Sequence, residues 1–139
     1  MSIHLVDANV LIALLVPDHQ HHSAAESWMD GLEDADLIAS DPAVEGALTR
    51  YAVRIGHSAA QVQRTLRRVH EIARWRFWPD DLPYADSDLS TVRGHRQVTD
   101  SYLASLARHH GGRLVTFDRA LAARLPDVVE LLEPSGRPG

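Results

Sequence analysis

The stretch IHLVDANVLIALLV, residues 3–16, decides the fold of this chain. Two apolar runs, Ile3–Val6 and Asn9–Val16, lie on either side of Asp7, and neither contains a charged side chain. Such runs alone do not separate a buried strand from a buried helix. The first has the length of a short strand, so we expect Asp7 to stand at the carboxyl end of that strand.

Outward from this stretch, helical periodicity alternates with short apolar runs. We expect strands at 37–39, 75–78, 113–117 and 128–132, and helices at 23–32, 43–55, 58–73, 100–110 and 119–124. This alternation is typical of an α/β fold, in which helices cover both faces of a parallel sheet. We expect one domain over residues 1–133 and a short tail over residues 134–139.

The composition narrows the class of protein further. With 139 residues, 45% of them hydrophobic and 24% charged, the chain falls in the globular range. The absence of Cys excludes a disulfide framework, thiolate metal sites and cysteine nucleophiles. No apolar run approaches the length that crosses a bilayer, and residues 1–7 carry no signal-like pattern. We therefore expect a cytoplasmic protein without a membrane partner.

The charge is unevenly distributed along the chain. A net charge of −5 argues against indiscriminate binding to nucleic acid. However, the segment 50–76 contains seven Arg and a single Glu, which leaves local phosphate binding open. Arg64, Arg67 and Arg68 either cover apolar surface with their long side chains or guide RNA phosphates, and the sequence leaves both interpretations open.

Four acidic residues occupy positions that would converge at one edge of the predicted sheet. Asp7 and Asp118 follow predicted strands, while Glu45 and Asp100 lie near the starts of predicted helices. Any one of them could simply cap a helix or form a turn. Together they repel one another unless a cation compensates them, and an all-oxygen ligand set favours Mg²⁺ or Mn²⁺. Asn9 could hydrogen-bond a carboxylate or a metal-bound water.

The residues around these acids carry a family resemblance. The motif DANVL at 7–11 resembles the first motif of PIN-domain ribonucleases. Glu45 with Leu48 and Arg50 resembles the family's central acidic helix, and the segments 98–107 and 111–118 resemble its third and fourth acidic elements. The segment 22–25 is similar to the VapC toxin branch of type II toxin–antitoxin modules. The resemblance extends from Ile3 to about Leu131.

This resemblance implies a PIN-like three-layer α/β/α fold, with a short parallel sheet flanked by helices. It also implies an acidic pocket that holds Mg²⁺ or Mn²⁺ and consists of Asp7, Glu45, Asp100 and Asp118. Asp7 and Asp100 would be metal ligands. Glu45 would bind the ion through water or help to activate the nucleophilic water, and Asp118 would hold a water or a second ion.

Further expectations follow from the same resemblance. Asn9 and Thr116 would support the acidic pocket. The substrate would be RNA, and a cognate VapB-like antitoxin would inhibit the enzyme. A homodimer is also expected, and the apolar helix face at 44–55 is compatible with one.

Several alternatives remain open from the residues themselves. The chain could be a catalytically inactive PIN-fold module that binds RNA or protein, or a DNA-directed nuclease or metal-dependent phosphatase. The dense histidines at 19–22 are interpreted as a solvated loop rather than a transition-metal site, because they have neither helical spacing nor a companion Cys. His109 and His110 are expected to interact with the carbonyls at a helix C-terminus.

Overall fold

A computed structural model describes residues 1–134 as a five-stranded parallel sheet flanked by helices. Residues 135–139 of the predicted tail lie outside the described part. The strand order is β3-β2-β1-β4-β5. The strands are β1 (Ile3–Val6), β2 (Leu37–Ser40), β3 (Trp75–Phe77), β4 (Arg113–Thr116) and β5 (Val129–Leu131).

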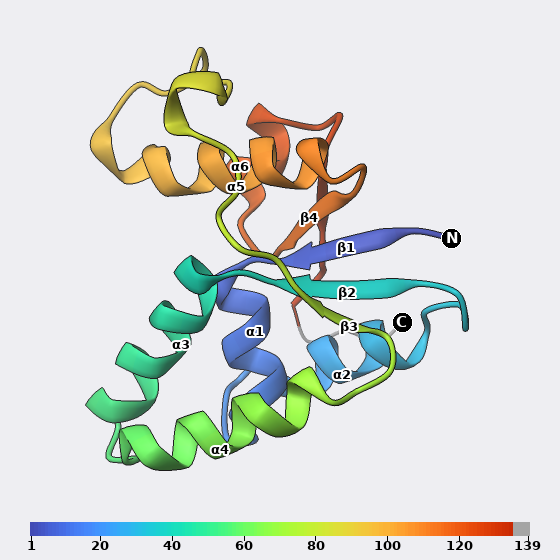
Figure 1. The fold of residues 1–139 in the computed structure, drawn as a ribbon, viewed down its shortest axis with the longest axis vertical. Helices are drawn as coiled ribbons and strands as arrows, with labels where there is room; N and C mark the ends of the chain where they lie inside the picture. Colours follow the sequence, from blue (N-terminus) through green and yellow to red (C-terminus); the bar gives the residue numbers. More distant parts are fainter. Residues whose placement is uncertain (135–139) are drawn as a thin grey trace.

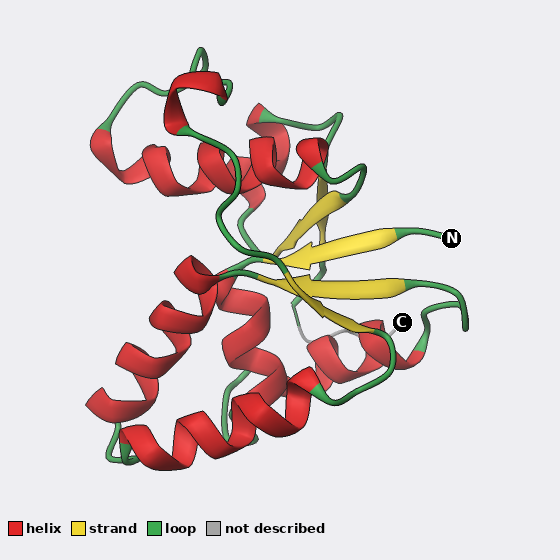
Figure 2. Ribbon diagram, in the orientation of Figure 1, coloured by secondary structure: helices red, strands yellow, loops and turns green. Residues whose placement is uncertain are grey.

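Helices cover both faces of the sheet. They are α1 (Ala8–Leu15), α2 (His22–Asp30), α3 (Pro42–Arg54), α4 (Ala59–His70), α5 (Val98–His109) and α6 (Arg119–Arg124), with short 3₁₀ turns at Tyr84–Asp86 and His95–Gln97. Figure 1 shows α1 to α4 on one side of the sheet and α5 with α6 on the other. Figure 2 shows the strands as a single layer between them. The predicted three-layer α/β/α fold is confirmed.

The quoted stretch forms the centre of this arrangement. Leu5 of β1 pairs with Ala39 of β2 on one side and with Leu114 of β4 on the other. A central parallel strand is covered on both faces, which explains why Ile3–Val6 is a continuous apolar run. The second run becomes helix α1, because Asp7 accepts a hydrogen bond from the Ala8 amide and caps that helix.

Helix starts follow the capping chemistry of the sequence. Asp41 caps α3 with Pro42 in the first turn, and Ser58 forms a reciprocal capping box with Gln61 at the start of α4. Several predicted boundaries differ by one to three residues. Helix α4 ends at His70 rather than at residue 73, and α5 begins at Val98 with no side-chain cap.

Helix α3 uses its apolar face within the chain. Val44, Leu48 and Ala52 are buried in the core, and α3 packs against α1 and α4. The apolar helix face at 44–55, which is compatible with a dimer in the sequence, is therefore largely buried within the chain. Val53 and Ile55 remain exposed at the C-terminal end of α3.

The Gly111-Gly112 turn joins α5 tightly to the sheet. Gly111 has a φ of +74°, a left-handed conformation that favours glycine. A Cβ on Gly112 would lie 2.6 Å from the carbonyl oxygen of Ile3. Only glycine allows this approach of α5 and β4 to β1. No helix within residues 1–134 is long and apolar enough to cross a membrane.

Candidate active site

Between β1 and β4 the connections change from one side of the sheet to the other, which makes the carboxyl ends of these two strands a topological switch point. From β1 the chain moves outward to β2 and β3, and it then crosses back to β4 and β5. Ligands of open parallel sheets bind at such a switch point. Asp7 directly follows β1, and Thr116 ends β4. The backbone amide of Asp7 donates to the carbonyl of Val115 at 2.9 Å, which fixes these two ends side by side.

Asp7 is a buried carboxylate with two hydrogen-bond donors. Its Oδ1 accepts from the Ala8 amide at 2.8 Å, and its Oδ2 accepts from the Thr116 hydroxyl at 2.7 Å. Asp7 is only 6% exposed. Burial raises the pKa of Asp7, the two hydrogen bonds oppose that rise, and the nearby charge of Asp118 adds to it.

The Thr116 hydroxyl organises two further side chains around Asp7. It accepts from Asn9 Nδ2 at 3.1 Å and from the Asp118 amide at 3.0 Å. Asn9 Oδ1 in turn accepts from the Phe117 amide at 3.2 Å. Asp118 caps α6, because its Oδ1 accepts from the Leu121 amide at 3.1 Å. Asn9 and Thr116 thus act on the orientation of the carboxylates.

Asp100 lies in the first turn of α5, near the carboxylates of Asp7 and Asp118. Burial raises the pKa of Asp100 to about 6, with further contributions from Asp7 and Asp118, whereas Arg124 opposes the rise. Arg124 lies in the last turn of α6 and donates to the Ser101 hydroxyl at 3.3 Å. The structure therefore brings Asp7, Asp100 and Asp118 into one electrostatic group, with Arg124 as a neighbouring cation that sequence reasoning missed.

Glu45 has a different set of neighbours. Its Oε2 accepts from the Ser40 hydroxyl at 2.7 Å and lies 2.7 Å from His70 Nε2. Ser40 also accepts from the indole of Trp75 at 3.0 Å. Glu45 is not among the charges that raise the pKa of Asp7 or Asp100. No sequence pattern pointed to His70, because its contact with Glu45 spans 25 residues and depends on how α4 packs.

A second acidic pair lies at the ends of β2 and β3. Asp41 is fully buried, and its Oδ1 accepts from the Val44 amide at 3.0 Å. Burial and the adjacent carboxyl of Asp80 raise the pKa of Asp41 to about 7. Asp41 also caps α3, and its proximity to Asp80 depends on the path of the loop after β3, which no local sequence pattern encodes.

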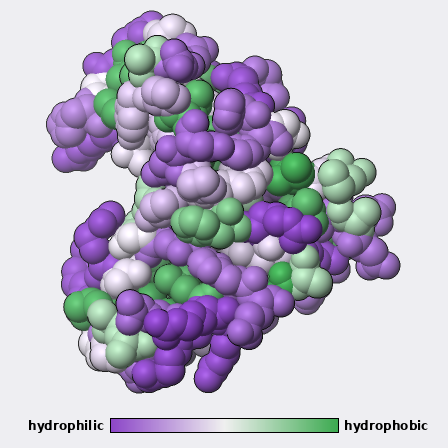
Figure 3. Space-filling model, in the orientation of Figure 1, coloured by the Kyte–Doolittle hydropathy of each residue, from purple (hydrophilic) through white to green (hydrophobic). Residues whose placement is uncertain are grey.

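The Arg-rich segment lies mostly on α4. Arg64, Arg67 and Arg68 are exposed on this helix, and hydrophilic side chains gather over its outer surface in Figure 3. No hydrogen bond or ion pair within residues 1–134 joins these three side chains to the acidic group. Both interpretations of the segment therefore remain open.

The histidines at 19–22 are more ordered than a solvated loop. His22 begins α2, and its Nδ1 lies 2.7 Å from the carbonyl oxygen of Ala13. The His21 ring stacks on Phe117, with ring centres 5.0 Å apart. The interpretation as a solvated loop was wrong for these two residues. His22 contacts α1, His21 contacts Phe117 after β4, and both side chains are half-buried.

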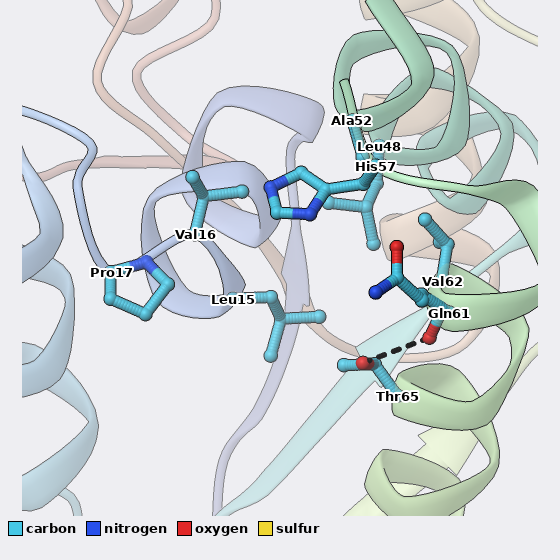
Figure 4. Close-up of a pocket in the computed structure, with 9 residues that line it drawn as sticks. All are labelled: Leu15, Val16, Pro17, Leu48, Ala52, His57, Gln61, Val62 and Thr65. Atoms are coloured by element: carbon cyan, nitrogen blue, oxygen red, sulfur yellow. Dashed lines mark hydrogen bonds between the residues drawn. The ribbon is translucent and has the colours of Figure 1, made fainter. Parts of the chain in front are cut away.

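An apolar pocket lies apart from the acidic group, between the C-terminal end of α1 and helices α3 and α4. Figure 4 shows its lining, which includes Leu15, Leu48 and Val62. Its volume is about 110 Å³. Leu15 is about 12 Å along α1 from Asp7, at 1.5 Å per residue. This pocket does not contribute charge to phosphate chemistry.

Comparison with known proteins places the chain in a family. The model of the PIN domain matches residues 4–126. Ribonuclease VapC29 of Mycobacterium tuberculosis is 46% identical over 128 residues, covering 92% of this chain and 95% of that protein. Ribonuclease VapC39 of the same species is 41% identical, covering 85% of this chain and 90% of that protein.

A solved structure agrees with these relatives. The crystal structure of VapBC2 from Rickettsia felis, bound to a promoter DNA fragment, contains a chain of the same fold, with a TM-score of 0.67, 17% identity and coverage of 94% of this chain and 99% of that one. The protein therefore belongs to the PIN-domain family and, within it, to the VapC ribonucleases.

Proposed function

We propose that this protein is the toxin of a type II toxin–antitoxin module, an endoribonuclease that hydrolyses RNA phosphodiester bonds with Mg²⁺ or Mn²⁺. The observation that carries the proposal is the group of three carboxyls, Asp7, Asp100 and Asp118, at the switch point of the sheet. Burial is the main cause of the raised pKa values of Asp7 and Asp100, and the charges of the neighbouring acids add to it, so a bound cation would relieve the repulsion among the three carboxyls.

The donor set fits a hard divalent ion. The proposed ligands are the carboxylate oxygens of Asp7, Asp100 and Asp118, and the side-chain amide of Asn9 lies beside them. This set contains neither Cys nor His. Asp7 and Asp100 would hold the ion directly, and Asp118 would hold a second ion or a water. When bound, the ion supplies a water of lowered pKa and neutralises phosphate charge.

The chain's own residues prepare this site. The Thr116 hydroxyl and the Ala8 amide fix both oxygens of Asp7, so its carboxylate has a single orientation before any ligand arrives. The hydroxyl also holds Asn9 and the Asp118 backbone, which makes it the common support of the pocket. Arg124 balances part of the charge of Asp100.

Glu45 is proposed to orient or activate the attacking water. The His70 imidazole, 2.7 Å from its Oε2, and the Ser40 hydroxyl hold that carboxylate in its present orientation. To reach the attacking water, Glu45 would release its contact with Ser40 or with His70.

The substrate and partner follow from the family. RNA is the proposed substrate, and Arg64, Arg67 and Arg68 are the proposed contacts for its phosphates. A cognate VapB-like antitoxin is the proposed inhibitor, and relatives of this fold are found in VapBC complexes. The homodimer remains a prediction.

The decisive test is RNA cleavage by the purified chain with Mg²⁺ or Mn²⁺. Asp7→Asn and Asp100→Asn are expected to abolish cleavage, and asparagine still caps α1, so the fold survives the first change. Asp34→Asn, at an exposed loop position, is the matched control and should cut like the parent. Cleavage by Asp7→Asn or Asp100→Asn at the parent's rate would assign the activity to a contaminant or another site.

The alternatives give different results in two simple measurements. A catalytically inactive binding module would bind no divalent ion in a calorimetric titration. A DNA-directed nuclease or a phosphatase would bind the ion, but single-stranded DNA or a phosphate monoester would then be the better competitor of the cleavage reaction.

A further inference from the structure

A second group of potential metal ligands lies at the other end of α5. Asp81 follows β3, and His109 and His110 end α5. One ligand atom from each of these three residues lies within 4.8 Å of the other two. Two imidazoles and a carboxylate from two distant segments thus converge at one point of the surface.

The surrounding structure holds His110 in place. Its ring stacks on Trp78 with ring centres 4.0 Å apart and planes 16° from parallel. Its Nε2 lies 3.0 Å from Asp81 Oδ1. The prediction that His110 serves the helix carbonyls is therefore wrong, because Asp81 and Trp78 take up its ring.

The backbone around the group is also constrained. The Gly111-Gly112 turn fixes the end of α5 against β1. On the other side, the Tyr102 hydroxyl donates to the carbonyl of Leu82 at 2.8 Å, which holds the segment after β3 along α5. These two contacts hold both ligand-bearing segments in position, which lowers the cost of ordering them around a cation.

We propose that Asp81, His109 and His110 form a binding site for a divalent transition-metal ion of the Zn²⁺ class. Imidazole ligands favour zinc, copper or nickel over Mg²⁺. Zinc–nitrogen bonds of about 2.0–2.1 Å in a tetrahedron separate the ligand atoms by about 3.3 Å, so modest side-chain movement from the present spacing suffices. Asp81 and His109 are exposed, which leaves the fourth position to water.

The ion pair between Asp81 and His110 does not account for the whole group. His109 adds a third donor that the pair does not use. A bound divalent ion uses all three groups, with both imidazoles neutral.

This site is separate from the acidic pocket. Asp100 and His110 are about 15 Å apart along α5, at 1.5 Å per residue. The two sites also differ in ligand chemistry, since one offers carboxylates and the other mainly imidazoles. The second site joins the segment after β3 to the end of α5, so the bound ion stabilises this contact and is independent of RNA cleavage.

The test is a calorimetric titration of the full chain with Zn²⁺ in excess Mg²⁺, using Asp100→Asn as the background in every sample so that the acidic pocket competes little. The parent background is expected to bind one Zn²⁺ per chain with a rise in thermal midpoint. His109→Asn and Asp81→Asn are expected to weaken this binding at least roughly 10- to 100-fold, the loss seen even for groups behind a ligand. Both are surface changes, so the variants remain folded.

Matched controls separate this group from the other histidines, of which the chain has nine in total. His95→Asn, at an exposed position, and His19→Asn, in the 19–22 group, should keep the zinc-dependent rise in thermal midpoint. Co²⁺ in place of Zn²⁺ should give intense visible absorption in the parent background that His109→Asn abolishes. Absence of a zinc equivalent, or its loss in His19→Asn but not in His109→Asn, would overturn the proposal.

Discussion

Removal of the Thr116 hydroxyl tests how the acidic pocket is supported. Thr116 is fully buried, and its hydroxyl donates to Asp7 at 2.7 Å while accepting from Asn9 at 3.1 Å and from the Asp118 amide at 3.0 Å. Thr116→Val keeps the shape and removes all three contacts. A hydrogen bond to a charged group contributes about 1.5–3 kcal/mol, so we expect the metal-free variant to lose about that much unfolding free energy at neutral pH.

The loss should depend on pH in a defined direction. Burial already raises the pKa of Asp7 above 3.8, and the Thr116 bond opposes that rise. Without the bond the pKa of Asp7 rises further. A carboxyl with a higher pKa in the folded chain than in the unfolded chain makes folding less favourable as pH rises from the unfolded value through the folded one. At a second, acidic pH, low enough to protonate this carboxyl, only a neutral hydrogen bond is missing, which is a loss of about 0.5–1.5 kcal/mol.

Urea unfolding in EDTA at the two pH values measures both effects, provided that the slope with urea is unchanged. Thr116→Ser retains the hydroxyl and should show no such pH dependence. Thr65→Val, which removes an exposed hydroxyl contact on α4, should change stability by no more than about 0.5 kcal/mol. An equal deficit for Thr116→Val at both pH values, or no deficit at all, would refute the assigned role of the hydroxyl.

Three further predictions concern the metal, the second acidic pair and the glycine turn. Because the pKa of Asp100 is raised to about 6, Mg²⁺ or Mn²⁺ should raise the thermal midpoint more at about one pH unit above that value than one unit below it, where protons compete; equal rises would contradict this. Because the pKa of Asp41 is raised to about 7, metal-free stability should fall as pH rises from about 4 to 7, and Asp80→Asn should flatten that fall in urea titrations. Gly112→Ala should lower the unfolding free energy by about 1–3 kcal/mol through overpacking, whereas Gly94→Ala, with open space around it, should stay within about 0.5 kcal/mol of the parent in the same assay.

The fold was predictable where local pattern and tertiary environment agree. Strands β1 and β4 are buried on both faces, so adjacent apolar residues, Leu5-Val6 and Leu114-Val115, identify them. The run 9–16 was ambiguous, because a buried helix and a buried strand have the same composition there. The Asp7 cap and the crossover to β2 select the helix. Trp78 lies beyond the end of β3 and is nevertheless buried, a placement that period-two alternation does not provide.

The candidate site was predictable in its backbone positions and less so in its contacts. The ends of parallel strands meet at one edge, so Asp7 and Asp118 could be expected to converge before any coordinates. The contacts of Glu45 depend on the packing of α4 against α3 and β3, which no local pattern encodes. The position of Arg124 near Asp100 could not be predicted from the sequence either, because it depends on how α6 lies against α5.

The helix-capping and functional interpretations of these acids are not exclusive. Asp7, Asp41 and Asp118 each cap the helix that follows their strand. Capping uses one carboxylate oxygen and fixes the side chain, and the second oxygen is then free to meet another group. In Asp41 that group is Asp80, and in Asp7 it is the Thr116 hydroxyl beside two further acids. A capping Asp at the carboxyl end of a parallel strand therefore becomes a candidate metal ligand when other acids lie near it. Asp100, at the start of α5, adds a carboxylate near Asp7 and Asp118, and a cation would balance the charge of this group.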